Sequence, residues 1–210
     1  MTFILITSYY KSGNEKRQNE IDECLFHNVN NKYISKIYLL NDQIYEELNE
    51  KYKENNKIVQ IVVDDENKKR LTYKCSISFI NEHLKGERCI MANSDIYYDE
   101  TLEHLVNYDL SDKFFALARY QKGVVIEDKG SQDTWIFTSP ANVPLEDCNF
   151  HFGVPGCDHK ILYIFEKSGY KISNPSRTIR SHHLHDSNFR TYRPRDRVRM
   201  PYAYAYPSFL

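Results

Sequence analysis

Short apolar runs alternate with segments of helical periodicity along the first half of the chain. The apolar runs predict buried strands at residues 3–7, 37–40, 58–63, 88–92 and 114–119. The segments between them carry helical spacing or capping side chains, and they predict helices at 15–28, 42–53, 71–84 and 101–108. Strands that alternate with helices are typical of α/β proteins. We therefore expect a mostly parallel central sheet with helices on both faces.

The second half of the chain is less regular. It predicts a polar loop or hairpin at 123–133, short strands at 135–137, 170–172 and 178–179, and a helix at 158–167 that Asp158 caps. Neither an internal repeat nor a long linker divides the sequence. We therefore expect one domain over residues 1–210, with a first half to about residue 110 and a second half from 111.

The apolar run at 88–92 stops abruptly at polar residues. Asn93, Ser94 and Asp95 follow it at once. In open α/β sheets, ligands bind at the carboxyl ends of the strands. A hard divalent cation takes oxygen ligands and shares them with substrate phosphates. The segment therefore predicts a metal–diphosphate site, although a polar strand-to-helix turn would have the same composition.

Further polar side chains are expected at this edge of the sheet. Asp64 ends the third strand, where it would bond a base or a ribose, or else lie in a surface turn. Arg17 suits a phosphate or a sugar, but it would also suit an ion pair with Glu15 or Glu20 on a solvated helix face. The residues expected to contact a nucleotide are Thr7, Ser8, Tyr9, Arg17, Asp64, Arg70, Tyr73, Asn93 and Ser94.

Two carboxylates in the second half are candidates for catalysis. Asp133 precedes the short strand that contains Trp135, and Asp158 follows Gly156 at a predicted helix start. Glycine allows a substrate to approach the backbone closely. A carboxylate beside a reacting hydroxyl acts as a general base. Simple helix capping is the alternative role for Asp158, and the two roles are compatible.

The histidines near the end of the chain are candidate metal ligands. His183 and His185 alternate on a chain that reads as extended, so they point to one side. One imidazole would complete the metal shell of Asp95. A structural zinc site is disfavoured because no two cysteines are suitably spaced with the histidines. Hydrogen-bonded loop histidines are the alternative.

Composition narrows the classes of function. The 210-residue chain has a formal net charge of -1, so it has no global field that attracts nucleic acid or a membrane. No apolar stretch is long enough to span a membrane, and the N-terminal run lacks the features of a signal peptide. The 5 cysteines are scattered without a CxxC pair, which favours free thiols and the cytoplasm.

The tail is rich in arginine. Its arginines alone would suit nucleic-acid phosphate, a diphosphate leaving group or an acidic acceptor. The near-neutral charge of the whole chain disfavours nucleic acid. The tail arginines are Arg177, Arg180, Arg190, Arg193, Arg195, Arg197 and Arg199.

In their order and spacing, these segments resemble the glycosyltransferases of the GT-A fold. More narrowly, they resemble the small GT-A domains encoded by large DNA viruses, of the chlorella-virus type, and some bacterial relatives. The resemblance covers nearly the whole chain. It rests on Thr7-Ser8-Tyr9 with Arg17 and Glu20, Arg70-Leu71-Thr72-Tyr73, Ala92-Asn93-Ser94-Asp95-Ile96, Gln132-Asp133-Thr134-Trp135-Ile136-Phe137, Pro155-Gly156-Cys157-Asp158, Asn174-Pro175-Ser176 and His183-Leu184-His185.

The resemblance implies a single-domain GT-A (Rossmann-like) fold with a nucleotide-binding half and an acceptor half. It implies a transferase that moves a sugar from a nucleotide-diphosphate sugar, most often UDP-linked, to a hydroxyl of a glycan or glycoprotein. Mn²⁺ or Mg²⁺ would be held by Asp95 with His183 or His185, while Asn93 replaces the usual first Asp of the motif. Asp158 matches the base of inverting members best and Asp133 second. A viral source would place the protein in the host cytoplasm.

Three other functions stay open from the residues. A sugar nucleotidyltransferase has a similar sheet, but it typically carries a glycine-rich loop after the first strand, and residues 8–14 contain only Gly13. A non-catalytic nucleotide-sugar-binding module would bind nucleotide without transfer. A nucleic-acid-binding protein built on the arginine-rich tail would have no role for Asp95 or Asp158.

Overall fold

The alternating first half of the chain forms the parallel part of the sheet. The computed structural model describes residues 2–63, 70–187 and 189–210. The strands here are β1 (Phe3–Thr7), β2 (Ile34–Asn41), β3 (Ile58–Val62) and β4 (Arg88–Ala92), and the helices are α1 (Glu15–Asn30), α2 (Glu46–Lys51) and α3 (Tyr73–His83). β1 pairs in parallel with both β2 and β4, and β2 pairs in parallel with β3. The predicted strand–helix alternation is confirmed.

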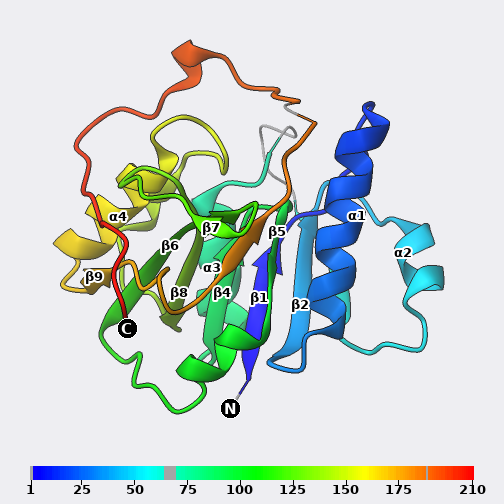
Figure 1. The fold of residues 1–210 in the computed structure, drawn as a ribbon, viewed down its shortest axis with the longest axis horizontal. Helices are drawn as coiled ribbons and strands as arrows, with labels where there is room; N and C mark the ends of the chain where they lie inside the picture. The colour runs from blue at the N-terminus through cyan, green and yellow to red at the C-terminus, as the bar shows by residue number, and fades with distance from the viewer. Residues whose placement is uncertain (1, 64–69, 188) are drawn as a thin grey trace.

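The second half extends the same sheet with mixed strand directions. The strand order is β3-β2-β1-β4-β8-β6-β10-β5, with β7 and β9 also paired to β6 (Figure 1). β8 lies antiparallel between β4 and β6, whereas β10 is parallel to β6. The elements are β5 (Ile96–Tyr98), η1 (Glu100–Leu105), β6 (Lys113–Gln121), β7 (Val124–Val125), β8 (Gln132–Thr138), η2 (Leu145–Cys148), α4 (Cys157–Lys167), β9 (Lys171–Ser173), β10 (Ser181–His183) and η3 (Pro194–Asp196).

Helices cover both faces of the sheet, as predicted. Side chains alternate across a strand, so Ile4 and Ile6 of β1 pack in one core while Phe3 and Leu5 pack in the other. α3 and α4 supply apolar side chains to the first core, and α1 and α2 supply them to the second. Figure 1 shows α1 in front of the sheet and α3 behind it. The α/β fold class expected from the sequence is therefore confirmed.

Local hydrogen bonds explain where the expected helices differ from the observed ones. Asn14 caps α1 as predicted, accepting from the backbone N–H of Arg17. The segment predicted as a helix at 101–108 is the 3₁₀ helix η1. Arg88 donates to the carbonyls of Val106 (2.9 Å) and Tyr108 (3.0 Å), which removes these groups from a continuing helix. α2 begins only at Glu46, without a side-chain cap.

Two predictions for the end of the chain were wrong. Asp158 does not cap α4: the capping position is Gly156, whose φ of 81° is left-handed, and Asp158 lies in the first helical turn. Residues 178–179 form no strand, because the backbone N–H groups of Thr178 and Ile179 both donate to the Pro175 carbonyl in a turn. The late strand is β10 instead, and it begins at Ser181.

Candidate active site

The sheet brings polar residues from three strands to one edge. β1 and β4 are parallel, so Thr7 and Ala92 end side by side. β8 runs the opposite way, and the pairing of Ala92 with Thr134 puts the start of β8 at the same edge. The backbone N–H of Asn93 consequently donates to the Asp133 carbonyl at 3.1 Å. Residues far apart in sequence therefore meet where α/β sheets bind ligands.

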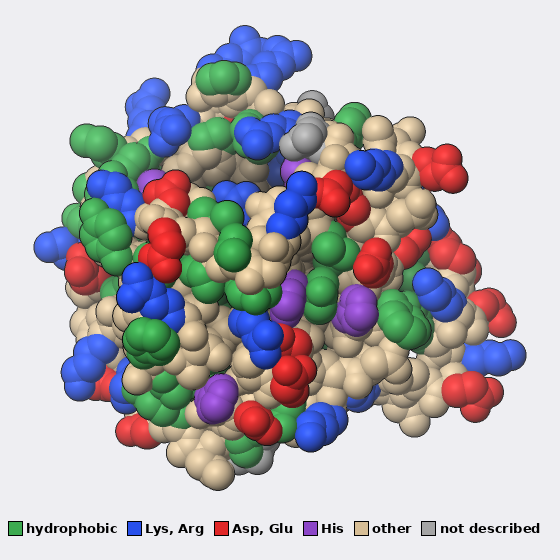
Figure 2. Space-filling model, viewed as in Figure 1, with side chains coloured by type: hydrophobic (Ala, Val, Ile, Leu, Met, Phe, Trp, Pro, Cys, Tyr) green, Lys and Arg blue, Asp and Glu red, His purple; other side chains and the backbone are tan. Residues whose placement is uncertain are grey.

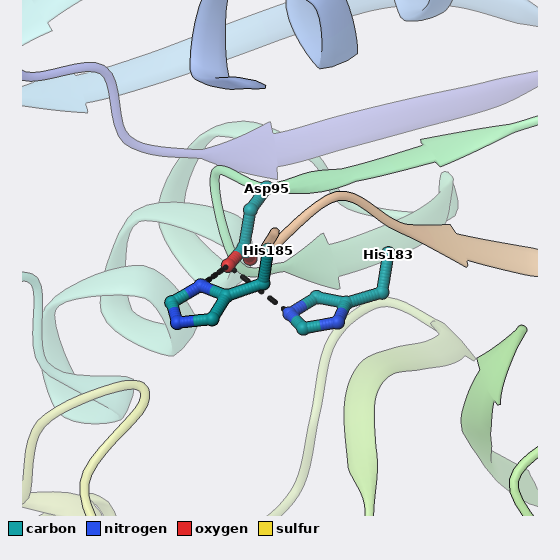
Figure 3. Close-up of side chains that lie close together, drawn as sticks. All are labelled: Asp95, His183 and His185. Atoms are coloured by element: carbon teal, nitrogen blue, oxygen red, sulfur yellow. Dashed lines mark hydrogen bonds and ion pairs between the residues drawn. The ribbon is translucent and has the colours of Figure 1, made fainter. Parts of the chain in front are cut away.

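Asp95 lies at the centre of a cluster of three side chains, of which Asp95 and His183 are buried and His185 is half-buried. β10 pairs with β5 so that His183 lies opposite Ile96, beside Asp95. Asp95 Oδ2 lies 3.2 Å from His183 Nε2 and 3.5 Å from His185 Nδ1. Figure 3 shows both imidazole rings converging on this carboxylate. The ligand atoms of the three residues lie within 4.8 Å of one another, which is close enough for one metal ion.

The chemistry of this cluster fits a divalent cation. Asp95 Oδ1 and His183 Nδ1 are buried and have no hydrogen-bond partner among the described residues. A buried carboxylate oxygen without a partner is costly, and a cation would satisfy it. Burial opposes ionisation of Asp95, but His183, His185 and Arg17 outweigh it and hold its pKa well below the usual range. The carboxylate is therefore charged at neutral pH.

Arg17 connects this cluster to α1. Its guanidinium lies 2.8 Å from Asp95 Oδ2 and 3.2 Å from Glu20 Oε2, and all three side chains are buried. Glu20 also accepts from the backbone N–H and the hydroxyl of Ser187, at 2.6 and 2.8 Å. The predicted ion pair of Arg17 with Glu20 forms, but it is buried and not on a solvated helix face, and it coexists with a contact to the candidate metal ligand. The segment after β10 is tied to α1 through Glu20.

A second group of carboxylates lies at the start of β8 and α4. Asp133 Oδ1 accepts from Asn93 Nδ2 at 2.6 Å, and its Oδ2 lies 2.9 Å from Arg119 Nε. Asp158 Oδ1 accepts from the backbone N–H of His159 at 3.0 Å. Burial first, and then the charge of Asp133, raises the pKa of Asp158 to about 7. A carboxylate with this pKa takes up and releases a proton near neutral pH, as a general base must.

Arg70 reaches the edge of the cleft next to Asn93. Arg70 Nη1 donates to the carbonyl of Phe152 at 3.2 Å. Gly153 has a φ of 64°, and a Cβ there would lie 3.0 Å from Arg70 Nη1 and 3.9 Å from the Asn93 amide. Glycine therefore lets the loop before α4 approach both side chains. Arg70, Gly153 and Asn93 therefore lie close together.

The other expected nucleotide contacts divide into three groups. Thr7, Ser8, Tyr9, Asn93 and Ser94 line one small cavity at the ends of β1 and β4. Within it, the buried Thr7 hydroxyl has no partner among the described residues. Asp64 lies outside the described residues. Tyr73 forms the third group, because it lies in the hydrophobic core.

Tyr73 does not face the cleft, contrary to the sequence-based expectation. Its side chain is fully buried, with its ring stacked on Phe152 at 4.0 Å and edge-on to Trp135 at 5.0 Å. Its hydroxyl lies 3.7 Å from Cys157 Sγ. Tyr73, the first residue of α3, therefore packs against the loop before α4 through Phe152.

We expect the Tyr73→Phe variant to keep nucleotide binding and most of the stability, because it loses only a weak O–H···S contact. We expect Tyr73→Ala to lower the free energy of unfolding by about 3–5 kcal/mol through the cavity it leaves. Chemical denaturation and nucleotide titration of both variants measure these effects. A loss of nucleotide affinity in Tyr73→Phe would mean that the hydroxyl contacts the ligand after all.

Arg119 is the site residue that sequence reasoning did not single out. It lies in β6, and its pKa is raised chiefly by the charge of Asp133. Its sequence signal was a cation at the end of the largely apolar run at 114–119, followed by a polar loop. The pairing depends on β6 lying next to β8, and no local pattern specifies that order.

Known proteins resemble this chain in structure and not in sequence. No protein-family model matches the chain, and no curated protein matches its sequence. Among solved structures, S. aureus TarS 1-349 matches 87% of this chain and 60% of its own length, with a TM-score of 0.58 and 14% identity. The mannosyltransferase PcManGT from Pyrobaculum calidifontis, in complex with GDP-Man and Mn²⁺, matches 83% of this chain and 54% of its own, with a TM-score of 0.53 and 10% identity.

The chain therefore spans little more than half the length of these two structures. These organisms give no support to the predicted viral source. Within residues 2–63, 70–187 and 189–210, no helix is both long and apolar enough to cross a membrane. At these low identities the structural matches establish the fold alone, which is the single-domain, GT-A-type (Rossmann-like) α/β fold expected from the sequence.

Proposed function

We propose that this chain is a metal-dependent glycosyltransferase that takes a sugar from a nucleotide diphosphate. The observation that carries the proposal is the pairing of two unlike carboxylates at one sheet edge. Asp95 is held charged among two imidazoles and an arginine, whereas Asp158 is buried with a pKa of about 7. A transfer reaction needs both, since one site must hold the anionic leaving group and the other must take a proton.

The donor would lie across the ends of β1 and β4, in the first half of the chain. Thr7, Ser8 and Ser94 would meet the nucleoside, and Arg70 and Arg17 would face the phosphates. Asp95, His183 and His185 would hold Mn²⁺ or Mg²⁺, which supplies positive charge to the departing diphosphate. The GDP-Man and Mn²⁺ bound by PcManGT support this donor class. UDP is the expected carrier from the sequence resemblance.

The acceptor would approach from the second half, where Asp158 would act as the base. Asp158 would take the proton from a hydroxyl of a glycan or glycoprotein, and that oxygen would attack the anomeric carbon from the face opposite the diphosphate. This geometry gives a product of inverted configuration. Asp133 would hold the side chains of Asn93 and Arg119 in place at the sheet edge. It would not accept the proton, because its two oxygens already face these side chains.

The direct test is product analysis with a panel of UDP- and GDP-sugars in the presence of Mn²⁺. The proposal predicts release of the nucleoside diphosphate from one donor, accelerated by an acceptor glycan. Formation of a nucleotide sugar and pyrophosphate from a nucleoside triphosphate and a sugar phosphate would instead indicate a nucleotidyltransferase. Absence of both reactions, with nucleotide binding intact, would indicate a binding module.

We expect the Asp133→Asn variant to shift the acidic limb of the pH–rate profile to lower pH. The negative charge of Asp133 helps to raise the pKa of Asp158, and Arg119 lowers it. Without Asp133, Asp158 loses the repulsion and faces an unpaired Arg119, so its deprotonated form persists at lower pH. The kcat/KM profile from pH 5 to 9 measures the shift. A shift to higher pH would contradict this coupling.

A further inference from the structure

The segment that follows His185 of the Asp95 cluster carries an unusual density of positive charge. We define the arginine strap as residues 190–199, which contain Arg190, Arg193, Arg195, Arg197 and Arg199 against a single acidic residue, Asp196. All five arginines are exposed. Figure 2 shows Lys and Arg side chains gathered at the top of the molecule, where Figure 1 draws this segment in orange.

The strap arginines differ from the other arginines around the site. Arg17, Arg119 and Arg180 each form an ion pair with a carboxylate, as does Arg177 with Glu127. Among the residues that the structure describes, no carboxylate forms an ion pair with any of the five strap arginines. Arg190 instead donates to the Tyr192 hydroxyl at 2.9 Å. The strap therefore presents positive charge that the described part of the protein does not neutralise.

A hydrogen bond near each end holds the strap beside the candidate base. At one end, Arg70 donates to the hydroxyl of Thr191. At the other end, the N–H of Val198 donates to the carbonyl of Pro155 at 2.9 Å. Arg197 Nη1 would lie 3.5 Å from a Cβ placed on Gly156, two residues before Asp158. The strap thus runs from Arg70 to the start of α4, where the candidate base Asp158 lies.

The number of arginines distinguishes the ligand of the strap from the donor diphosphate. The strap carries five guanidinium groups within ten residues, which is more than the two phosphates of one donor require. A partner that uses them together must carry several anionic groups along its length. Guanidinium groups bind phosphate and carboxylate through paired hydrogen bonds. The position beside Asp158 further requires that this partner present a hydroxyl.

We propose that the strap binds an acceptor that is a polyanionic glycan, with phosphate or carboxylate groups on repeating units. This inference rests on the proposed function, because it assigns the strap to the acceptor of the same reaction. Electrostatic attraction along the strap would draw the acceptor chain to the cleft and align its hydroxyl with Asp158. Binding should weaken as salt is added, while nucleotide binding at the buried Asp95 cluster should respond less.

The test compares two variants that each remove three positive charges. The strap variant is Arg193→Gln/Arg195→Gln/Arg199→Gln. The matched control is Lys32→Gln/Lys85→Gln/Lys167→Gln, whose lysines are also exposed and lie elsewhere in the sequence. The labelled probes are oligogalacturonate, a phosphomannan oligosaccharide, neutral dextran and single-stranded RNA, with vesicles that contain phosphatidylserine as a further arm. Thermal stabilisation by UDP or GDP with Mn²⁺ is measured in parallel.

We expect the wild type to bind an anionic glycan but not dextran, and the strap variant to bind it about tenfold more weakly. The control variant should bind like the wild type, and all three proteins should respond equally to nucleotide. Equal glycan binding by the strap variant, or no glycan binding by the wild type, would overturn the inference. The inference would also be overturned if the wild type bound RNA or the vesicles more tightly than the anionic glycans and the strap substitutions abolished that binding. Loss of the nucleotide response in all three proteins would contradict the proposed function itself.

Discussion

Replacing Asp158 by Asn is expected to lower kcat by about 10²–10⁴-fold while leaving nucleotide affinity nearly unchanged. The amide keeps the size of the side chain but cannot accept the acceptor proton. In the wild type, the raised pKa of about 7 means that the active, deprotonated form is lost as pH falls. The wild-type rate should therefore rise between pH 6 and 8, and the residual rate of Asp158→Asn should lack this dependence. Steady-state kinetics over that range measure both effects.

Stability gives this variant a second readout. Because the fold raises the pKa of Asp158, the native state favours the protonated carboxyl, and the ionised carboxyl destabilises the protein as pH rises through about 7. Asp158→Asn should therefore unfold at a higher temperature than the wild type at pH 8, and at a similar temperature at pH 4. The control is Glu166→Gln on the exposed part of α4, which should change neither rate nor stability. Full activity of Asp158→Asn would exclude this residue as the base.

Replacing Asp95 by Asn is expected to abolish metal-dependent nucleotide binding and to lower kcat/KM by at least about 10²-fold. The substitution removes the one carboxylate among the three candidate ligands, and neutral amides hold divalent cations weakly. Among the described residues, it also leaves Glu20 as the one carboxylate in an ion pair with the buried Arg17. Breaking a buried ion pair costs about 3–5 kcal/mol, and the retained Glu20 contact places the expected loss near the lower end. Metal titration and chemical denaturation measure the two effects.

Asp99 offers a matched control for Asp95. Its Oδ2 lies 2.8 Å from His182 Nε2 and 2.9 Å from Arg180 Nε, so it too is a carboxylate between a histidine and an arginine. It directly follows Tyr98, the last residue of β5, and it caps η1. We expect Asp99→Asn to lose stability but to keep metal-dependent nucleotide binding. Equal loss of nucleotide binding in both variants would mean that the effect of Asp95→Asn comes from destabilisation.

The sequence predicted the site best where a strand end and its ligands are adjacent in the chain. The polar residues Asn93 to Asp95 directly follow β4, and Thr7 is the last residue of β1. The strand–helix alternation also predicted the parallel part of the sheet. In these places, one local pattern specifies both the element and its exposed edge.

The sequence predicted less where strand order decides which residues meet. β8 inserts between β4 and β6 in antiparallel orientation, and only this order brings Asp133 to Asn93 and Arg119. β5 has three residues, too few for a recognisable alternation, yet its pairing with β10 brings His183 to Asp95. Tyr73 was misplaced because an aromatic residue after Arg70 suits a base as well as a core. The pairing of strands that are distant in sequence decides which of these residues meet, and local sequence patterns do not specify that pairing.

The most direct test of the proposed donor site is thermal unfolding with UDP and GDP, each with and without Mn²⁺, for the wild type and Asp95→Asn. A ligand at one hundred times its dissociation constant adds about 2.7 kcal/mol, which for a domain of this size raises the melting temperature by roughly 5–10 °C. We predict that one nucleotide stabilises the wild type only with metal and leaves Asp95→Asn unchanged. Stabilisation that needs no metal, or no stabilisation by either nucleotide, would contradict a metal–diphosphate site at Asp95.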